Sequence, residues 1–130
     1  MNYLSIELIK GNAAHNTLAD NQFLNQWSIL YDKCNHATIF QHPSFVCTWY
    51  KTYSQKWRPL IIKSCNSDGD LTGLWLLAYN PENHTLVYTG AHQAEYQVWI
   101  TISGEDITFL SKAWILLKDH FDVKEPNRVS

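Results

Sequence analysis

The sequence predicts a mixed α/β domain of the α+β class, with a largely antiparallel sheet covered by helices and the element order β-α-α-β-β-β-β-α. Three observations predict this class. Short apolar and β-branched runs between residues 57 and 102 are separated by Gly, Pro, Asn and Asp clusters, which is typical of strands joined in sequence order. Two segments before this region repeat apolar residues at helical spacing, and one segment after it does the same.

The central region is expected to contain four strands. They cover residues 58–65, 71–79, 85–89 and 96–102. The second strand is apolar on both faces, with Leu71 and Trp75 on one face and Leu74 on the other, so it is predicted to lie centrally with cover above and below. Gly73 inside this strand predicts a β-bulge or a close approach of another backbone segment.

The N-terminal third is expected to begin with a half-buried strand over residues 3–9, because apolar and polar residues alternate there. Residues 11–16 are polar and are interpreted as a connection. Asp20 is a suitable N-cap for a first helix. One face of that helix is expected to carry Phe23, Trp27, Leu30 and Cys34.

A second helix is expected to begin at Pro43, which is favoured in the first turn of a helix, after an extended linker over residues 37–43. Its apolar stripe is predicted to be Phe45, Trp49 and Tyr53, widened by Val46 and Tyr50.

The last helix is expected to follow a cap at Ser103. Its predicted apolar stripe is Ile107, Leu110, Trp114, Leu117 and Phe121. Residues 1–121 are therefore interpreted as one domain, and residues 122–130 as a polar tail or a truncated linker to a second domain.

Composition excludes several classes of protein. A hydrophobic content of 45% with 17% charged residues excludes a disordered chain. A net charge of −2 without a Lys/Arg cluster argues against DNA as a partner. There is no signal-peptide pattern and no apolar run of the roughly 20 residues that span a bilayer, so a cytoplasmic location is expected.

Motifs that would bind a metal or a phosphate are missing from the sequence. The six histidines form no H-x-H or H-E-x-x-H pattern, and the five glycines never cluster into a phosphate-binding loop. Neither a metal nor a cofactor is therefore expected in this chain. Cys47 lies early in the second helix and is the best placed of three cysteines for a nucleophile, although such a thiol is usually a small buried side chain.

Two polar stretches are the candidates for a site. The first is residues 40–45, where Gln41 and His42 precede the start of a helix whose backbone N–H groups point outward. The second is residues 90–96, which lead into the last strand and contain Glu95 and Tyr96. Both can border one cleft if the sheet winds as predicted. The alternative is that they only form caps and turns.

These two stretches, the preceding helix with Trp27 and the turn at Asp68-Gly69 together resemble the N-terminal half of the FemAB/CelD-like acyltransferases of the GNAT superfamily. The resemblance covers residues 18–121. It implies a GNAT-like domain that is followed by a second, C-terminal GNAT-like domain. It also implies that the donor, an acyl-CoA or aminoacyl-tRNA, binds a Gly-rich loop at a helix N-terminus, which this chain lacks and the second domain would supply.

The resemblance implies transfer of an acyl or aminoacyl group to an amine or sugar acceptor, related to cell-envelope polysaccharide or peptidoglycan. Gln41, His42, Glu95 and Tyr96 are then the expected substrate-binding residues. Glu95 is the expected catalytic base for an acceptor amine, and Tyr96 is expected to orient it. Relatives often carry an acidic residue near this tyrosine, where this chain has Gln97. The 130 residues alone are expected to be inactive.

A second hypothesis has no catalysis. Six Trp and seven Tyr suit a binding module that presents an aromatic groove to a glycan or protein partner. A third hypothesis is a small complete acyltransferase with an unusual donor site.

Overall fold

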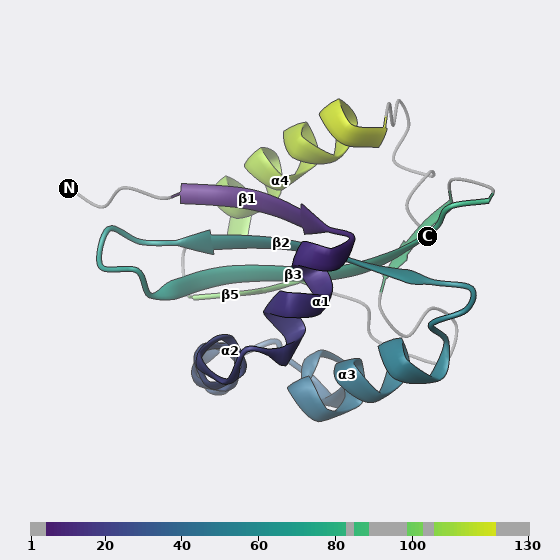
Figure 1. Cartoon of the computed structure of the whole chain (residues 1–130). Coiled ribbons are helices and arrows are strands. Elements are labelled where there is room, and N and C mark those ends of the chain that lie inside the picture. Colours follow the sequence, from purple (N-terminus) through teal and green to yellow (C-terminus); the bar gives the residue numbers. More distant parts are fainter. Residues whose placement is uncertain (1–4, 83–84, 89–98, 103–105, 122–130) are drawn as a thin grey trace.

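The structure is a computed structural model that describes residues 5–82, 85–88, 99–102 and 106–121. One antiparallel sheet lies between two layers of helices (Figure 1). The helices are α1 (Asn12–Ala19), α2 (Asn21–Lys33), α3 (Pro43–Thr52) and α4 (Asp106–Phe121), with a short 3-10 helix η1 (Ile39–Gln41). The strands are β1 (Ser5–Lys10), β2 (Arg58–Cys65), β3 (Leu71–Asn80), β4 (Thr85–Tyr88) and β5 (Ile100–Thr101). The predicted α+β class is confirmed.

Strands are joined in the order β1-β2-β3-β4, and β5 also pairs with β3. The β2–β3 hairpin is the longest pairing, from Arg58 opposite Tyr79 to Cys65 opposite Leu71. Its turn is held by the side chain of Asn66, whose Oδ1 accepts hydrogen bonds from the backbone N–H groups of Asp68 and Asp70. Gly69 has φ 85°, a conformation that glycine adopts without strain. The predicted strands and turn of this hairpin are confirmed.

Strands β4 and β5 occupy the same edge of β3. Leu77 lies opposite Tyr88 of β4, and Leu74 lies opposite Ile100 of β5. If β4 continued as an uninterrupted antiparallel strand, residue 91 would lie opposite Leu74. Ile100 lies there instead, so the chain has nine additional residues between these two pairings. Two short strands thus pair with the same edge of the central strand β3, and residues 89–99 lie between them in the sequence.

Each face of the sheet has its own core. The core under α1, α2 and α3 contains Trp27, Trp49 and Ile61, and the core under α4 contains Leu77 and Phe109. The prediction that β3 is apolar on both faces is confirmed. One assignment was wrong, because Leu71 packs with Leu74 in the first core instead of with Trp75.

The change of face at Leu71 has its cause in a β-bulge. Ser64 pairs with Gly73 but its neighbour Cys65 pairs with Leu71, so Thr72 is the additional residue. Gly73 also permits a close approach: a Cβ built there would lie 2.6 Å from Cδ1 of Phe109 and 2.6 Å from Oγ of Ser64. The predicted bulge is therefore present beside Gly73, whereas the close neighbours are the side chains of Phe109 and Ser64 and not another backbone. The absence of a side chain at Gly73 lets α4 pack closely onto the sheet.

Two helical predictions were wrong. Residues 11–16, predicted as a connection, include the start of α1, whose only buried residue is Ala14. Among residues 107–120 of α4, whose side chains are described, the buried ones are Phe109, Ala113 and Leu117. The side chain of Phe121, also predicted in the stripe, lies outside this range. Ile107, which was predicted in the stripe, is 83% exposed because the buried face begins at Phe109.

The other helix faces are close to the predictions. In α2 the buried residues Phe23, Trp27 and Leu30 are those predicted. In α3 the centre of the buried face is Val46, Trp49 and Tyr50. Among the described residues, no helix combines the length and the apolar character required to cross a membrane.

Candidate functional site

Gln41 is 4% exposed and holds the connection between α2 and α3 in place. Its Oε1 accepts hydrogen bonds from the backbone N–H of Thr38 at 2.7 Å and from Oγ1 of Thr38 at 3.0 Å, which forms a capping box. Its backbone carbonyl accepts a hydrogen bond from Nε1 of Trp27 at 2.9 Å. The predicted extended linker over residues 37–43 is thus interrupted by η1, because this capping box closes a turn.

His42 is the N-cap of α3. Its Nδ1 accepts a hydrogen bond from the backbone N–H of Ser44 at 3.1 Å, and its ring lies edge-on to Tyr31 with 5.0 Å between ring centroids. The ring is partly exposed, so Nε2 is the nitrogen that a ligand can use. Both predicted residues of this stretch therefore perform capping, and only His42 combines capping with exposure.

The capping role of His42 gives a prediction. His42→Ala is expected to lower the free energy of unfolding by about 1 kcal/mol, because the N–H of Ser44 loses its acceptor. His42→Asn is expected to keep most of the stability, since Asn is a favourable N-cap. Urea denaturation of the three proteins checks this. Equal losses for the Ala and Asn variants would contradict a capping role.

Glu95 and Tyr96 lie outside the described residues, and their predicted roles stay predictions. The neighbouring Trp99 does have a described position. Its backbone carbonyl is 2.8 Å from Nε2 of His36, which lies in the connection between α2 and α3. This contact joins the connection between α2 and α3 to the chain beside β5, and the predicted cleft between residues 40–45 and 90–96 stays a prediction.

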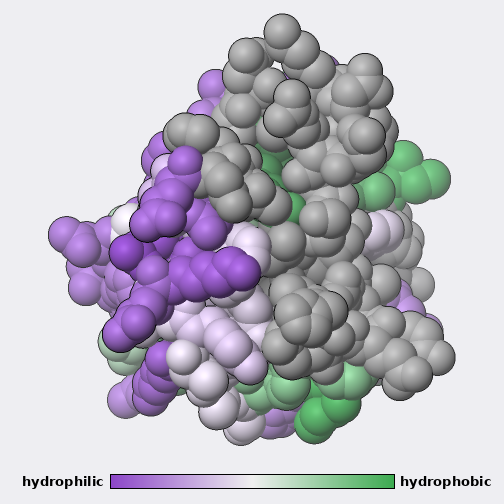
Figure 2. Space-filling model, turned by 90° about the vertical axis from the view of Figure 1, so that its right-hand side faces the viewer, coloured by the Kyte–Doolittle hydropathy of each residue, from purple (hydrophilic) through white to green (hydrophobic). Residues whose placement is uncertain are grey.

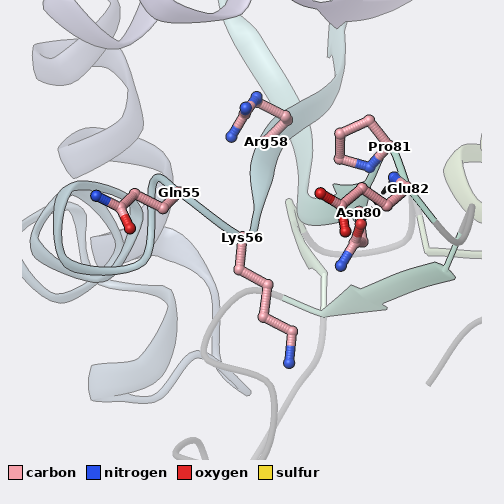
Figure 3. Close-up of a pocket in the computed structure, with 6 residues that line it drawn as sticks. All are labelled: Gln55, Lys56, Arg58, Asn80, Pro81 and Glu82. Atoms are coloured by element: carbon pink, nitrogen blue, oxygen red, sulfur yellow. Dashed lines mark hydrogen bonds between the residues drawn. The ribbon is translucent and has the colours of Figure 1, made fainter.

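A polar hollow of about 310 Å³ lies where β2 begins and β3 ends. Figure 3 shows its residues, Gln55, Lys56, Arg58, Asn80, Pro81 and Glu82. Figure 2 views this end of the molecule, where hydrophilic residues gather on one side of the described surface. The sequence gives little indication of a site here, because these residues flank strand ends and are of the types common in turns.

The charges in this hollow are partly engaged by the protein. Nη1 of Arg58 donates to the carbonyl of Ser54, and Nζ of Lys56 lies 5.4 Å from the centroid of the Trp57 ring. Oδ1 of Asn80 accepts from the backbone N–H of Glu82 at 2.8 Å. Two cations and one carboxylate allow polar contacts to a small ligand, but the set contains no nucleophile with an adjacent base.

A larger hollow of about 450 Å³ lies among α1, α2 and α3. Its lining is His15, Leu18, Ala19, Leu24, Cys47, Tyr50, Lys51 and Ser54. Sequence reasoning missed this hollow because one of its walls is α1, which was interpreted as a connection.

Cys47 faces that hollow, but its environment does not activate it. Burial raises the pKa of the Cys47 thiol, and the nearby Lys51 lowers it by a smaller amount. Burial also raises the pKa of Cys65. Since the thiolate is the nucleophile, both cysteines remain protonated and weakly reactive at neutral pH. Within the described ranges, no group of three or more His, Cys, Asp and Glu residues is arranged to hold a metal ion.

No protein-family model, no curated protein and no solved structure matches this chain.

Proposed function

We propose that this chain is the N-terminal GNAT-like domain of an N-acyltransferase. The enzyme transfers an acyl or aminoacyl group to an amine or sugar acceptor related to cell-envelope polysaccharide or peptidoglycan. The donor, an acyl-CoA or aminoacyl-tRNA, binds a C-terminal GNAT-like domain. The observation that carries the proposal is the shared edge of β3: residues 89–99 lie in the chain between two strands that pair with this same neighbour.

The position of the candidate residues in the chain supports the proposal. Residues 90–96 contain both candidate catalytic residues, and the strands before and after them in the chain, β4 and β5, both pair with β3. The β-bulge at Thr72 lies beside β5, because Gly73 pairs with Thr101. Bulges are over-represented next to active sites because they redirect side chains.

The chemistry assigned to this edge is acyl transfer. The acceptor nitrogen attacks the donor's carbonyl carbon, a C–N bond forms, and the C–S bond of a thioester or the C–O bond of an ester breaks. The nitrogen must lose one proton on the way, and Glu95 receives it in this proposal. Tyr96 orients the acceptor through its hydroxyl. The sulfur or oxygen leaving group takes up a proton from solvent or from the base.

Aromatic residues give less support to the alternative of an aromatic-rich binding module. Four of the six tryptophans, Trp27, Trp49, Trp57 and Trp75, are buried, and the remaining two, Trp99 and Trp114, are partly buried. The tryptophans therefore serve mainly the two cores.

The experiment measures release of free CoA from acyl-CoA, and deacylation of aminoacyl-tRNA, with a panel of amine and amino-sugar acceptors. The protein is this chain joined to its proposed C-terminal domain. Glu95→Gln is expected to lower the rate about a hundredfold, because the acceptor loses its base. Asp119→Asn, which changes an exposed carboxylate on α4, is the matched control and is expected to have no effect.

Isothermal titration of the 130 residues alone with acetyl-CoA is expected to show no stoichiometric binding. Tight binding would overturn the assignment of the donor to a second domain. A rate that Glu95→Gln leaves unchanged would overturn the assignment of the base.

A further inference from the structure

The hollow among α1, α2 and α3 has a mostly apolar interior. Its inner wall is formed by Leu18, Leu24, Cys47 and Tyr50, which are buried or partly buried. Its volume of about 450 Å³ falls in the range of about 300–1,000 Å³ that small-molecule sites occupy. A flexible hydrocarbon chain fits a space of this size and lining.

Two residues of the inner wall, Cys47 and Tyr50, carry polar groups, but neither presents a charge to the hollow. The hydroxyl of Tyr50 donates to the backbone carbonyl of Leu77 at 2.7 Å, which fixes the ring against the sheet. Burial keeps the Cys47 thiol protonated by raising its pKa. A charged or strongly polar group therefore finds no partner in the interior.

The rim of the hollow is polar and carries positive charge. His15, Lys51 and Ser54 are exposed there, and no Asp or Glu belongs to the lining. Asp20, the carboxylate between α1 and α2 in the chain, accepts a hydrogen bond from the backbone N–H of Gln22 as an N-cap. Charge complementarity thus favours an anionic group at the rim.

We infer that this hollow binds a medium-chain fatty acid, with its hydrocarbon chain against Leu18, Leu24 and Tyr50 and its carboxylate beside Lys51 and His15. The site is separate from the edge of β3 and does not depend on the proposed acyl transfer.

Decanoate tests this inference in isothermal titration with the whole chain. Affinity is expected to fall about fourfold for each methylene removed, from decanoate to octanoate to hexanoate, because each buried methylene contributes a similar transfer free energy. Decanol and decylamine are expected to bind at least about threefold more weakly, since they lack the carboxylate. Equal binding of all three head groups, or no binding of decanoate, would overturn the inference.

Two pairs of variants locate the binding. Lys51→Gln is expected to weaken decanoate binding about threefold, whereas Lys112→Gln on α4 leaves it unchanged. Ala19→Phe fills the hollow and is expected to weaken binding at least about tenfold. Ala13→Phe adds the same side chain to α1 at an exposed position outside the lining, and is expected to have no effect. Equal effects within either pair would place the ligand elsewhere.

Cys47 provides a readout that does not depend on affinity. Saturating decanoate is expected to slow its alkylation by N-ethylmaleimide at least about fivefold, as followed by site-resolved mass spectrometry. Cys65, on β2 and outside the lining, is the internal control and is expected to keep its rate. A Cys47 rate that depends on protein concentration and not on decanoate would show that a second copy covers the hollow, and would overturn the inference.

Discussion

Replacing Trp27 by alanine is expected to lower the free energy of unfolding by about 3–5 kcal/mol, which is a large part of the stability of a domain of this size. Trp27 is fully buried, and its ring lies 5.9 Å from that of Phe23. Its truncation leaves a cavity between α2 and the sheet. It also removes the hydrogen bond from Nε1 to the carbonyl of Gln41. Chemical denaturation followed by circular dichroism measures the loss.

Trp27→Phe separates the two contributions. This variant keeps most of the apolar volume but loses the hydrogen bond, so a loss of about 1–2 kcal/mol is expected. Trp114→Ala removes a partly buried tryptophan from α4 and is expected to cost less than Trp27→Ala. If the two alanine variants were equally unstable, the conclusion that Trp27 contributes more to stability than Trp114 would be wrong.

Replacing Gly73 by alanine is expected to cost about 3 kcal/mol, although it adds only one methyl group. The new Cβ would meet Cδ1 of Phe109 and Oγ of Ser64, each at 2.6 Å, where such carbon atoms are essentially never found. Ser64 is in turn hydrogen-bonded to Oγ1 of Thr72 at 3.0 Å inside the sheet. Relief therefore requires movement of α4 or loss of a buried hydrogen bond.

A double-mutant cycle identifies the cause of this loss. Phe109→Leu shortens the side chain that crowds position 73, so Gly73→Ala is expected to cost at least about 1 kcal/mol less in that background. Thermal and urea unfolding of the four proteins gives the coupling. Additive losses would mean that the contact with Phe109 is not what makes glycine necessary.

The sheet was predictable because its signals are local. The turn residues Asn66 and Gly69 lie between two apolar runs, and the bounds predicted for β2, residues 58–65, are those observed. Helix α1 was not predictable in this way. It has two turns and one buried residue, Ala14, and Gly11 at its N-cap supplies no side-chain hydrogen bond. Its helical state depends on packing against α2 and β1, which a sequence pattern does not reveal.

The face of α4 shows a different limit of sequence reasoning. The predicted stripe at positions 107, 110, 114 and 117 and the buried residues at positions 109, 113 and 117 both satisfy helical spacing and share Leu117. The choice between them depends on Ala113 and on Gly73, because small residues let the helix and the sheet approach closely. A pattern that weights large apolar side chains overlooks Ala113.

The candidate site was predictable only in part. Gln41 and His42 were identified as unusual, and the structure shows what their side chains do locally. The hollow among the helices was not found, because its residues come from three helices and form no motif. Long-range proximity of this kind has no signature in a single sequence.

The division of one edge of β3 between β4 and β5 also bears on how the protein can diversify. Both short strands pair with the same neighbour, and neither pairing uses residues 89–99. Each doubling of a flexible connection costs only about 0.6 kcal/mol in closure entropy. Insertions, deletions and wholesale replacement at this one position are therefore expected to leave the scaffold folded, which makes it the natural point for engineering or evolving a new specificity.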